Sequence, residues 1–127
     1  MAKILLVDDS KFQRKCVSGM LVNLGHLVSE AENGEKGLQM LEAAKPDLII
    51  TDLLMPVMDG LSMLRGLNEK KCSVPTVVVS ADIQESTKKE CLKLGAKAFL
   101  NKPITSADLE AMVNHLVRPA TEEKSPC

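Results

Sequence analysis

Short apolar runs alternate with amphipathic stretches along the whole chain of 127 residues. The runs predict β-strands at residues 3–7, 26–31, 47–51, 74–79 and 97–100, and such runs suit strands buried on both faces of a parallel sheet. Between them, apolar residues recur with a period of about 3.6, which is typical of amphipathic helices. These stretches predict helices at 10–24, 35–44, 60–68 and 83–94, and a last one that begins near Ser106. The alternation predicts an α/β fold, a single doubly wound five-stranded parallel sheet with five helices.

The helical periodicity also predicts which side chains face the core. In the first helix the inward positions are Phe12, Cys16, Val17, Met20, Leu21 and Leu24. Cys16 and Cys91 both fall on apolar helix faces, so we interpret them as small buried hydrophobic residues. Ser10, Asp59 and Ser106 precede helical stretches, and we expect their side-chain oxygens to cap those helices.

Composition narrows the class of protein without identifying it. Hydrophobic residues make up 45% of the chain, charged residues 26%, and the net charge is -1, so a general nucleic-acid or membrane surface is not favoured. No apolar run approaches the ~20 residues that span a bilayer, and no signal peptide is recognisable, so we expect a cytoplasmic protein. We predict a folded domain over 1–118 and a flexible tail over 119–127, which is polar and contains proline.

Polar and charged residues follow four of the predicted strands. Asp8 and Asp9 follow the first strand, Asp52 the third, Ser80 the fourth and Lys102 the fifth. Because parallel strands point the same way, these side chains should meet at one edge of the sheet, where ligands bind in open α/β folds. Carboxylates at ~4 Å repel by roughly 4 kcal/mol per pair at an effective dielectric of ~20. Lys102 offsets part of this, and an oxygen-liganded Mg²⁺ would offset more.

Each of these residues also has an ordinary structural interpretation. Asp8 and Asp9 could interact with the dipole of the first helix, and Asp52 could be a loop residue or a cap. Ser80 could belong to a turn, and Lys102 could be a solvated loop lysine. All five residues stand at strand ends, however, and this shared placement favours a functional site. With no His or Cys at these ends, Mg²⁺ is favoured over zinc.

Six segments of the chain resemble those of a known family. They are Lys-Ile-Leu-Leu-Val-Asp-Asp-Ser (3–10), Ala-Glu-Asn-Gly (31–34), Pro-Asp-Leu-Ile-Ile-Thr-Asp-Leu-Leu-Met-Pro-Val-Met-Asp-Gly (46–60), Val-Pro-Thr-Val-Val-Val-Ser-Ala (74–81), Gly-Ala (95–96) and Leu-Asn-Lys-Pro (100–103). Together they resemble the receiver domain of bacterial response regulators, which has a flavodoxin-like, CheY-like fold. The resemblance covers roughly residues 3–117, and the combination of segments is far more specific than any one of them.

The resemblance implies a role for each residue at the strand ends. Asp52 would accept a phosphoryl group from the phosphohistidine of a histidine kinase, giving an aspartyl phosphate. Asp9, Asp52 and the backbone carbonyl of Leu54 would bind Mg²⁺, with Asp8 helping directly or through water. Lys102 and Ser80 would contact phosphoryl oxygens. The Lys102-Pro103 peptide bond is expected to be cis, which proline permits.

The resemblance also implies how the signal leaves the domain. Phe99 stands at the position of the family's switch aromatic, and Ser80 would move with it. A downstream protein would bind the surface formed by the fourth helix, fifth strand and fifth helix, and we expect no nucleic acid to bind through this domain. Leu54 and Asp82 would tune the lifetime of the phosphorylated state. The chain would be a phosphoacceptor that catalyses its own phosphorylation and dephosphorylation, not an enzyme with a separate substrate.

Two other functions fit the same fold class. A Mg²⁺-dependent phosphatase with an aspartyl nucleophile would commonly need a second acid two residues after Asp52, where this chain has Leu54. A flavin-mononucleotide carrier would need a Ser-, Thr- or Gly-rich loop after the first strand and aromatic residues around the flavin. The chain has Asp8 and Asp9 there, and only two Phe with no Trp or Tyr. Both alternatives are therefore less favoured.

Overall fold

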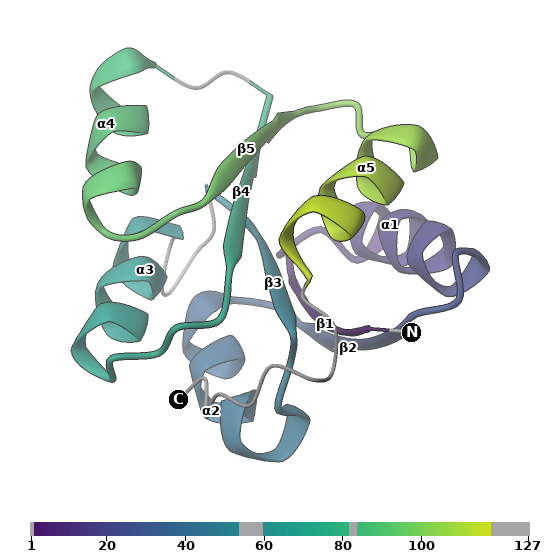
Figure 1. Ribbon diagram of the computed structural model, residues 1–127, viewed down its shortest axis with the longest axis horizontal. Coiled ribbons are helices and arrows are strands. Elements are labelled where there is room, and N and C mark those ends of the chain that lie inside the picture. The colour runs from purple at the N-terminus through teal and green to yellow at the C-terminus, as the bar shows by residue number, and fades with distance from the viewer. Residues whose placement is uncertain (1, 54–59, 82–83, 118–127) are drawn as a thin grey trace.

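The computed structural model describes residues 2–53, 60–81 and 84–117 and shows the predicted alternation of strands and helices (Figure 1). In chain order the elements are β1 (Lys3–Val7), α1 (Lys11–Asn23), β2 (Leu27–Ala31), α2 (Gly34–Ala44), β3 (Leu48–Asp52), α3 (Gly60–Glu69), β4 (Thr76–Ser80), α4 (Glu85–Lys93), β5 (Ala98–Asn101) and α5 (Ser106–Leu116). Every predicted element is present. The largest shifts are small: β4 begins at Thr76 instead of Val74, because Pro75 cannot donate to the strand ladder.

The sheet has the strand order β2-β1-β3-β4-β5, and every pair is parallel. Its register aligns the carboxyl ends of the central strands. Val7 of β1 pairs with Thr51, Asp52 of β3 pairs with Val79, and Ser80 of β4 pairs with Asn101. The residues that follow β1 and β3 therefore emerge side by side, and the predicted fold class is confirmed.

Helices cover both faces of the sheet. Figure 1 shows α1 and α5 on one face and α2, α3 and α4 on the other. Because side chains alternate along a strand, each strand contributes to both cores. Leu5 and Ile49 pack with the core under α2, α3 and α4, whereas Ile4 and Ile50 pack with the core under α1 and α5.

Two glycines allow α2 and α3 to pack closely. A Cβ atom added at Gly37 of α2 would lie 2.9 Å from Cε of Met63, and one added at Gly66 of α3 would lie 2.6 Å from Cδ1 of Leu38. Real Cβ atoms essentially never approach another heavy atom this closely. Each glycine thus makes room for a side chain of the opposite helix.

The structure corrects two predictions for α1. Phe12 is 78% exposed and Cys16 is also exposed, while Val17 and Leu21 form the buried stripe. One turn before Val17, the partly buried position is taken by Arg14, so the apolar residues at 12 and 16 project outward. The corresponding prediction for Cys91 of α4 is confirmed, because this residue is fully buried.

The helix caps agree only in part with the sequence. Ser10 caps α1 as predicted, and its side chain accepts a hydrogen bond from the backbone N–H of Gln13. The predicted cap Ser106 is instead the first residue of α5. Thr105 caps that helix, and its hydroxyl accepts a hydrogen bond from the backbone N–H of Asp108. Either hydroxyl could serve, and the register of the helix decides between them.

Several predictions lie outside the described residues: the cap at Asp59, the roles of Leu54 and Asp82, and the tail over 119–127. They stay predictions, as does the domain boundary at residue 118.

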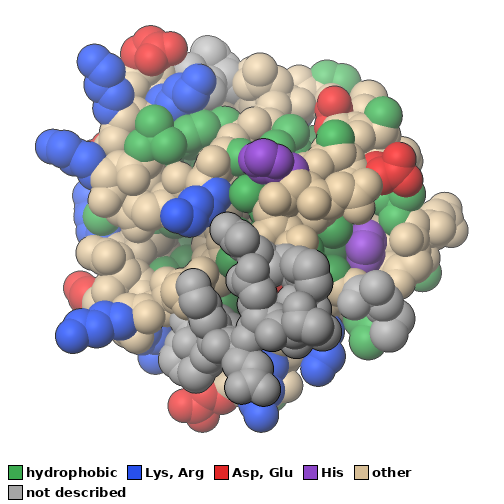
Figure 2. All heavy atoms as spheres, in the orientation of Figure 1, with side chains coloured by type: hydrophobic (Ala, Val, Ile, Leu, Met, Phe, Trp, Pro, Cys, Tyr) green, Lys and Arg blue, Asp and Glu red, His purple; other side chains and the backbone are tan. Residues whose placement is uncertain are grey.

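Among the described helices, none is long and apolar enough to cross a bilayer. Figure 2 shows Lys and Arg side chains gathered along the side of the molecule where Figure 1 draws α4 and α3.

Candidate functional site

Asp8 stands directly after β1 and is held by backbone groups. It is 5% exposed. Its Oδ1 accepts a hydrogen bond from the backbone N–H of Ser10 at 2.9 Å, and its own N–H donates to the carbonyl of Ala31 at 3.1 Å. Nη1 of Arg14 donates to the Asp8 carbonyl at 2.6 Å, while Nε of Arg14 bonds Glu30 at 3.1 Å. The first turn of α1 is thereby fixed to the ends of β1 and β2.

Asp52 is the last residue of β3, a central strand, and its carboxylate points into the same site. Its Oδ1 accepts a hydrogen bond from the backbone N–H of Leu53 at 2.8 Å. Its Oδ2 lies 3.0 Å from Nζ of Lys102, and the Asp52 side chain is only 11% exposed. Asp52 is therefore a mostly buried carboxylate with one close cationic partner.

The predicted carboxylate cluster is present. One carboxylate oxygen from each of Asp8, Asp9 and Asp52 lies within 4.8 Å of the others, with Asp8 buried and Asp9 exposed. Burial raises the pKa of the Asp8 carboxyl above its ordinary value; the hydrogen bond from Ser10 opposes this rise, and the Asp52 charge adds to it. A bound cation would therefore offset the repulsion within this cluster.

Lys102 reaches this cluster from the segment after β5. Its backbone N–H donates to the carbonyl of Ser80 at 3.1 Å, and the Lys102-Pro103 peptide bond is cis, as predicted. Its Nζ contacts Oδ2 of Asp52 at 3.0 Å and Oε1 of Gln13 at 2.7 Å. The sequence did not single out Gln13. Its place one helical turn before the buried Val17 was the only signal that its side chain could turn toward the site.

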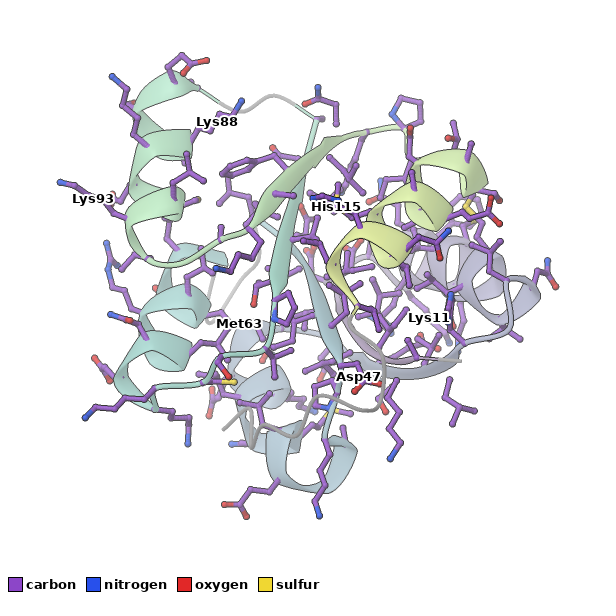
Figure 3. The ribbon with its side chains drawn as sticks, in the orientation of Figure 1. Lys11, Asp47, Met63, Lys88, Lys93 and His115 are labelled. Atoms are coloured by element: carbon purple, nitrogen blue, oxygen red, sulfur yellow. The ribbon has the colours of Figure 1, made fainter. Side chains whose placement is uncertain are left out.

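Ser80 lies on β4 and Phe99 on the neighbouring strand β5. Ser80 ends β4 and is 6% exposed, at the same edge as Asp52. Phe99 pairs with Val78 and is half-buried against the core under α4. Nζ of Lys88 lies 5.5 Å from the centre of the Phe99 ring, within the range of a cation–π contact. In Figure 3, Lys88 extends from α4 toward β5, whereas Lys93 of the same helix points away from the molecule.

Comparison with known proteins gives one consistent family. The family model described as the response regulator receiver domain matches residues 4–114. Protein PilH of Pseudomonas aeruginosa is 34% identical over 116 residues, which cover 90% of this chain and 96% of PilH. Chemotaxis protein CheY of Bacillus subtilis is 33% identical over 113 residues, which cover 88% and 94% of the two chains.

Solved structures agree with these relatives. Chemotaxis protein CheY4 of Vibrio cholerae superposes with a TM-score of 0.86 and 31% identity, covering 92% of this chain and 99% of CheY4. Other relatives are longer, and this chain spans only 28% to 56% of their length. The activities of their further parts are not carried over.

These matches favour a phosphoryl-accepting signalling domain over a phosphatase. The fold leads to the same conclusion, because the strand ends bring carboxylates and a lysine together as the family resemblance implies. The chain belongs to the response regulator receiver domain family, the phosphoacceptor domains of two-component signalling.

Proposed function

We propose that Asp52 is the residue that accepts the phosphoryl group, from the phosphohistidine of a histidine kinase. One observation carries this proposal: the Asp52 carboxylate ends a central strand, lies 3.0 Å from the Lys102 ammonium and shares a cluster with Asp8 and Asp9. We also propose that the transfer takes place in the cytoplasm.

The carboxylate cluster also fits the divalent cation that receiver domains use. Three carboxylates face one ammonium group, and all the candidate ligands are oxygen atoms, as a hard cation requires. Asp9, Asp52 and the carbonyl of Leu54 would hold Mg²⁺, and Asp8 would assist directly or through water. When bound, Mg²⁺ supplies positive charge that neutralises the transferring phosphoryl group.

The side chains of the site supply the rest of the chemistry. A carboxylate oxygen of Asp52 forms a bond to phosphorus while the bond from phosphorus to the histidine nitrogen breaks, giving an acyl phosphate. Lys102 lies within hydrogen-bond distance of this carboxylate, which supports the proposal that its ammonium pairs with a phosphoryl oxygen. We propose that the Ser80 hydroxyl binds another oxygen.

Phosphorylation by a small phosphodonor tests the acceptor. Incubate the protein with acetyl phosphate and Mg²⁺ and measure the intact mass. The parent should gain one phosphoryl group and Asp52→Asn should gain none. Asp47→Asn, which changes the carboxylate just before the other end of β3, is the matched control and should behave as the parent. Phosphorylation of Asp52→Asn at the parent's rate would overturn the assignment, and sustained turnover of a phosphomonoester would favour a phosphatase.

We further propose that the signal leaves through the surface of α4, β5 and α5. The half-buried Phe99 lies in β5 beside β4, the strand that ends at Ser80. Movement of Ser80 toward a phosphoryl oxygen would let the Phe99 ring turn inward. Complete burial of a Phe side chain is worth roughly 1.5–3 kcal/mol, so even part of this change would alter the population of the inward pose substantially. A downstream protein would read the altered surface.

Amide chemical shifts test this relay. Compare spectra with Mg²⁺ alone and with Mg²⁺ and beryllofluoride, a phosphoryl mimic. We expect changes at Ser80, at Phe99 and along α4. Changes confined to the neighbourhood of Asp52 would mean that Phe99 is only a core aromatic residue.

Leu54 and Asp82 are proposed to set the lifetime of the aspartyl phosphate. Each stands two residues after a proposed site residue, Asp52 or Ser80. Leu54 is apolar and cannot orient an attacking water, so hydrolysis should be slow for the family. Leu54→Asn should lose phosphate faster than the parent, and an unchanged rate would contradict this role.

A further inference from the structure

The Lys102 ammonium has a second partner that is not part of the carboxylate cluster. Oε1 of Gln13 accepts a hydrogen bond from Nζ of Lys102 at 2.7 Å, a shorter contact than the one to Asp52 at 3.0 Å. The two residues stand 89 positions apart in the chain. Gln13 belongs to the first turn of α1 and is neutral, so it holds the ammonium without adding charge to the site.

The backbone around Gln13 is firmly fixed. Its own N–H donates to the capping hydroxyl of Ser10 at 3.3 Å. The next residue, Arg14, is bonded to the Asp8 carbonyl and to Glu30. Gln13 is therefore carried by a helix turn that is tied to the ends of β1 and β2, and its amide oxygen is a well-placed acceptor.

A lysine ammonium needs a second acceptor to stay in one position. Its ammonium is a compact charge with three donors on a flexible four-carbon chain. In the proposed function, phosphorylation turns the Asp52 carboxylate into an acyl phosphate, so the contact between Lys102 and Asp52 must change during the reaction. The contact with Gln13 involves no reacting atom and can persist throughout.

We propose that Gln13 is a positioning residue for Lys102. Its amide oxygen holds the ammonium above the Asp52 carboxylate, which leaves the third N–H of Lys102 to meet an incoming phosphoryl oxygen. This inference rests on the proposed function, because it assumes that Asp52 is the acceptor. Alignment of a group before reaction lowers the cost of reaching the transition state.

The test uses the full chain with Gln13→Met, which keeps the length of the side chain and removes the amide. Gln39→Met, the same change at another exposed position, on α2, is the matched control. Three quantities are measured: the initial rate of phosphorylation by acetyl phosphate, the Mg²⁺ affinity, and the mobility of the Lys102 ammonium by nitrogen NMR relaxation. Gln13→Asn, too short by one methylene to keep the contact, provides a second variant in case the first folds poorly.

Loss of one hydrogen bond to the ammonium should slow phosphorylation by about 3- to 10-fold. The Lys102 ammonium should become more mobile, and the Mg²⁺ affinity should stay within about twofold of the parent, because Gln13 is not among the proposed ligands. Gln39→Met should match the parent in all three. An unchanged rate in both Gln13 variants would overturn the proposal, as would a slower rate with unchanged Lys102 mobility. If Asp52→Asn were phosphorylated normally, the proposed function itself would have failed instead.

Discussion

At the amino ends of the strands, two polar side chains accept hydrogen bonds from the backbone at the start of β1, whereas at the carboxyl ends three carboxylates lie close to one another. Oδ2 of Asp47, placed at the lower end of β3 in Figure 3, accepts a hydrogen bond from the backbone N–H of Lys3 at 2.9 Å. Nδ1 of His26 accepts one from the backbone N–H of Ala2 at 3.0 Å. At the opposite end, one carboxylate oxygen from each of Asp8, Asp9 and Asp52 lies within 4.8 Å of the others, and the Lys102 ammonium lies 3.0 Å from Asp52.

The two ends of the sheet therefore contribute differently to stability. The bonds at the amino end pair a side-chain acceptor with a backbone donor at the start of β1, and they favour folding. The cluster at the carboxyl end collects like charges, which disfavours folding unless a bound cation offsets them. Substitutions at the two ends should therefore change stability in opposite directions.

The largest expected effect is stabilisation by Mg²⁺ at the carboxyl end. With Mg²⁺ at 100 times its dissociation constant, the free energy of unfolding should rise by about 2.7 kcal/mol in the parent. Asp9→Ala should gain much less, because it lacks one proposed ligand, while Asp47→Ala should gain as much as the parent. Urea unfolding with and without Mg²⁺ measures this. Equal gains in Asp9→Ala and the parent would remove Asp9 from the metal site.

The next effect is a gain in stability from removing a charge. Burial raises the pKa of Asp8, so the folded state holds that proton more tightly than the unfolded state does, and ionised Asp8 costs stability above its folded-state pKa. Asp8→Asn keeps the oxygen that accepts from Ser10 and removes the charge. It should be more stable than the parent by about 0.5–2 kcal/mol at neutral pH without Mg²⁺.

Urea midpoints in a chelating buffer measure the Asp8 effect. The difference between Asp8→Asn and the parent should shrink as the pH falls from the folded-state pKa toward the ordinary value near 3.8, because the folded parent takes up the proton first. Below that value Asp8 is protonated in both states of the parent. If Asp8→Asn were less stable than the parent at neutral pH, the charge on Asp8 would not lower the stability of the folded state.

At the amino end the sign should reverse. Asp47→Ala removes the acceptor for the N–H of Lys3, and the free energy of unfolding should fall by about 0.5 kcal/mol, the low end for one hydrogen bond, since Asp47 is exposed. Glu42→Ala on α2 is an exposed control and should change stability less. If Asp47→Ala were stabilising, the contrast between the two ends would not hold.

The smallest effect concerns His26. Burial lowers the pKa of its imidazole below the ordinary value near 6.5, and protonation of Nδ1 would also break the bond from Ala2. The unfolded state then binds the proton more tightly, so stability should be complete above pH ~6.5 and decline as the pH falls toward the folded-state pKa.

A comparison of urea midpoints at neutral and mildly acidic pH tests the His26 contribution. His26→Gln should show a flatter pH dependence than the parent. His115→Gln changes the other histidine, which is exposed on α5, and should keep the parent's dependence. Identical pH profiles for His26→Gln and the parent would rule out the contribution.

The sequence was sufficient for the strands and for the residues that follow them. Periodicity predicted the elements, and parallel strands necessarily bring Asp8, Asp52 and Lys102 to one edge. It was less informative at helix ends. The hydroxyls of Thr105 and Ser106 are chemically equivalent as caps, and Phe12 is apolar but lies outside the stripe that begins at Val17.

Contacts between distant polar side chains were beyond the reach of pattern analysis. Gln13 and Lys102 are 89 positions apart, and no periodicity connects a neutral amide in one helix with a lysine after the last strand. Such a pair is set by how α1 sits over the sheet edge. The same limit applies to the contact between Lys88 and Phe99, which depends on the placement of α4 against β5.

The glycines between α2 and α3 have a consequence for anyone engineering this scaffold. Replacing a helical glycine by alanine usually favours folding by roughly 0.5–1 kcal/mol. At Gly37 and Gly66 an added methyl group would force the side-chain ends of Met63 and Leu38 to shift, which reduces that gain. Gly19, in the middle of α1, has no such neighbour within 4 Å of an added Cβ. A heat-resistant version of the domain should therefore be sought on the exposed side of α1, with the seam between α2 and α3 left as it is.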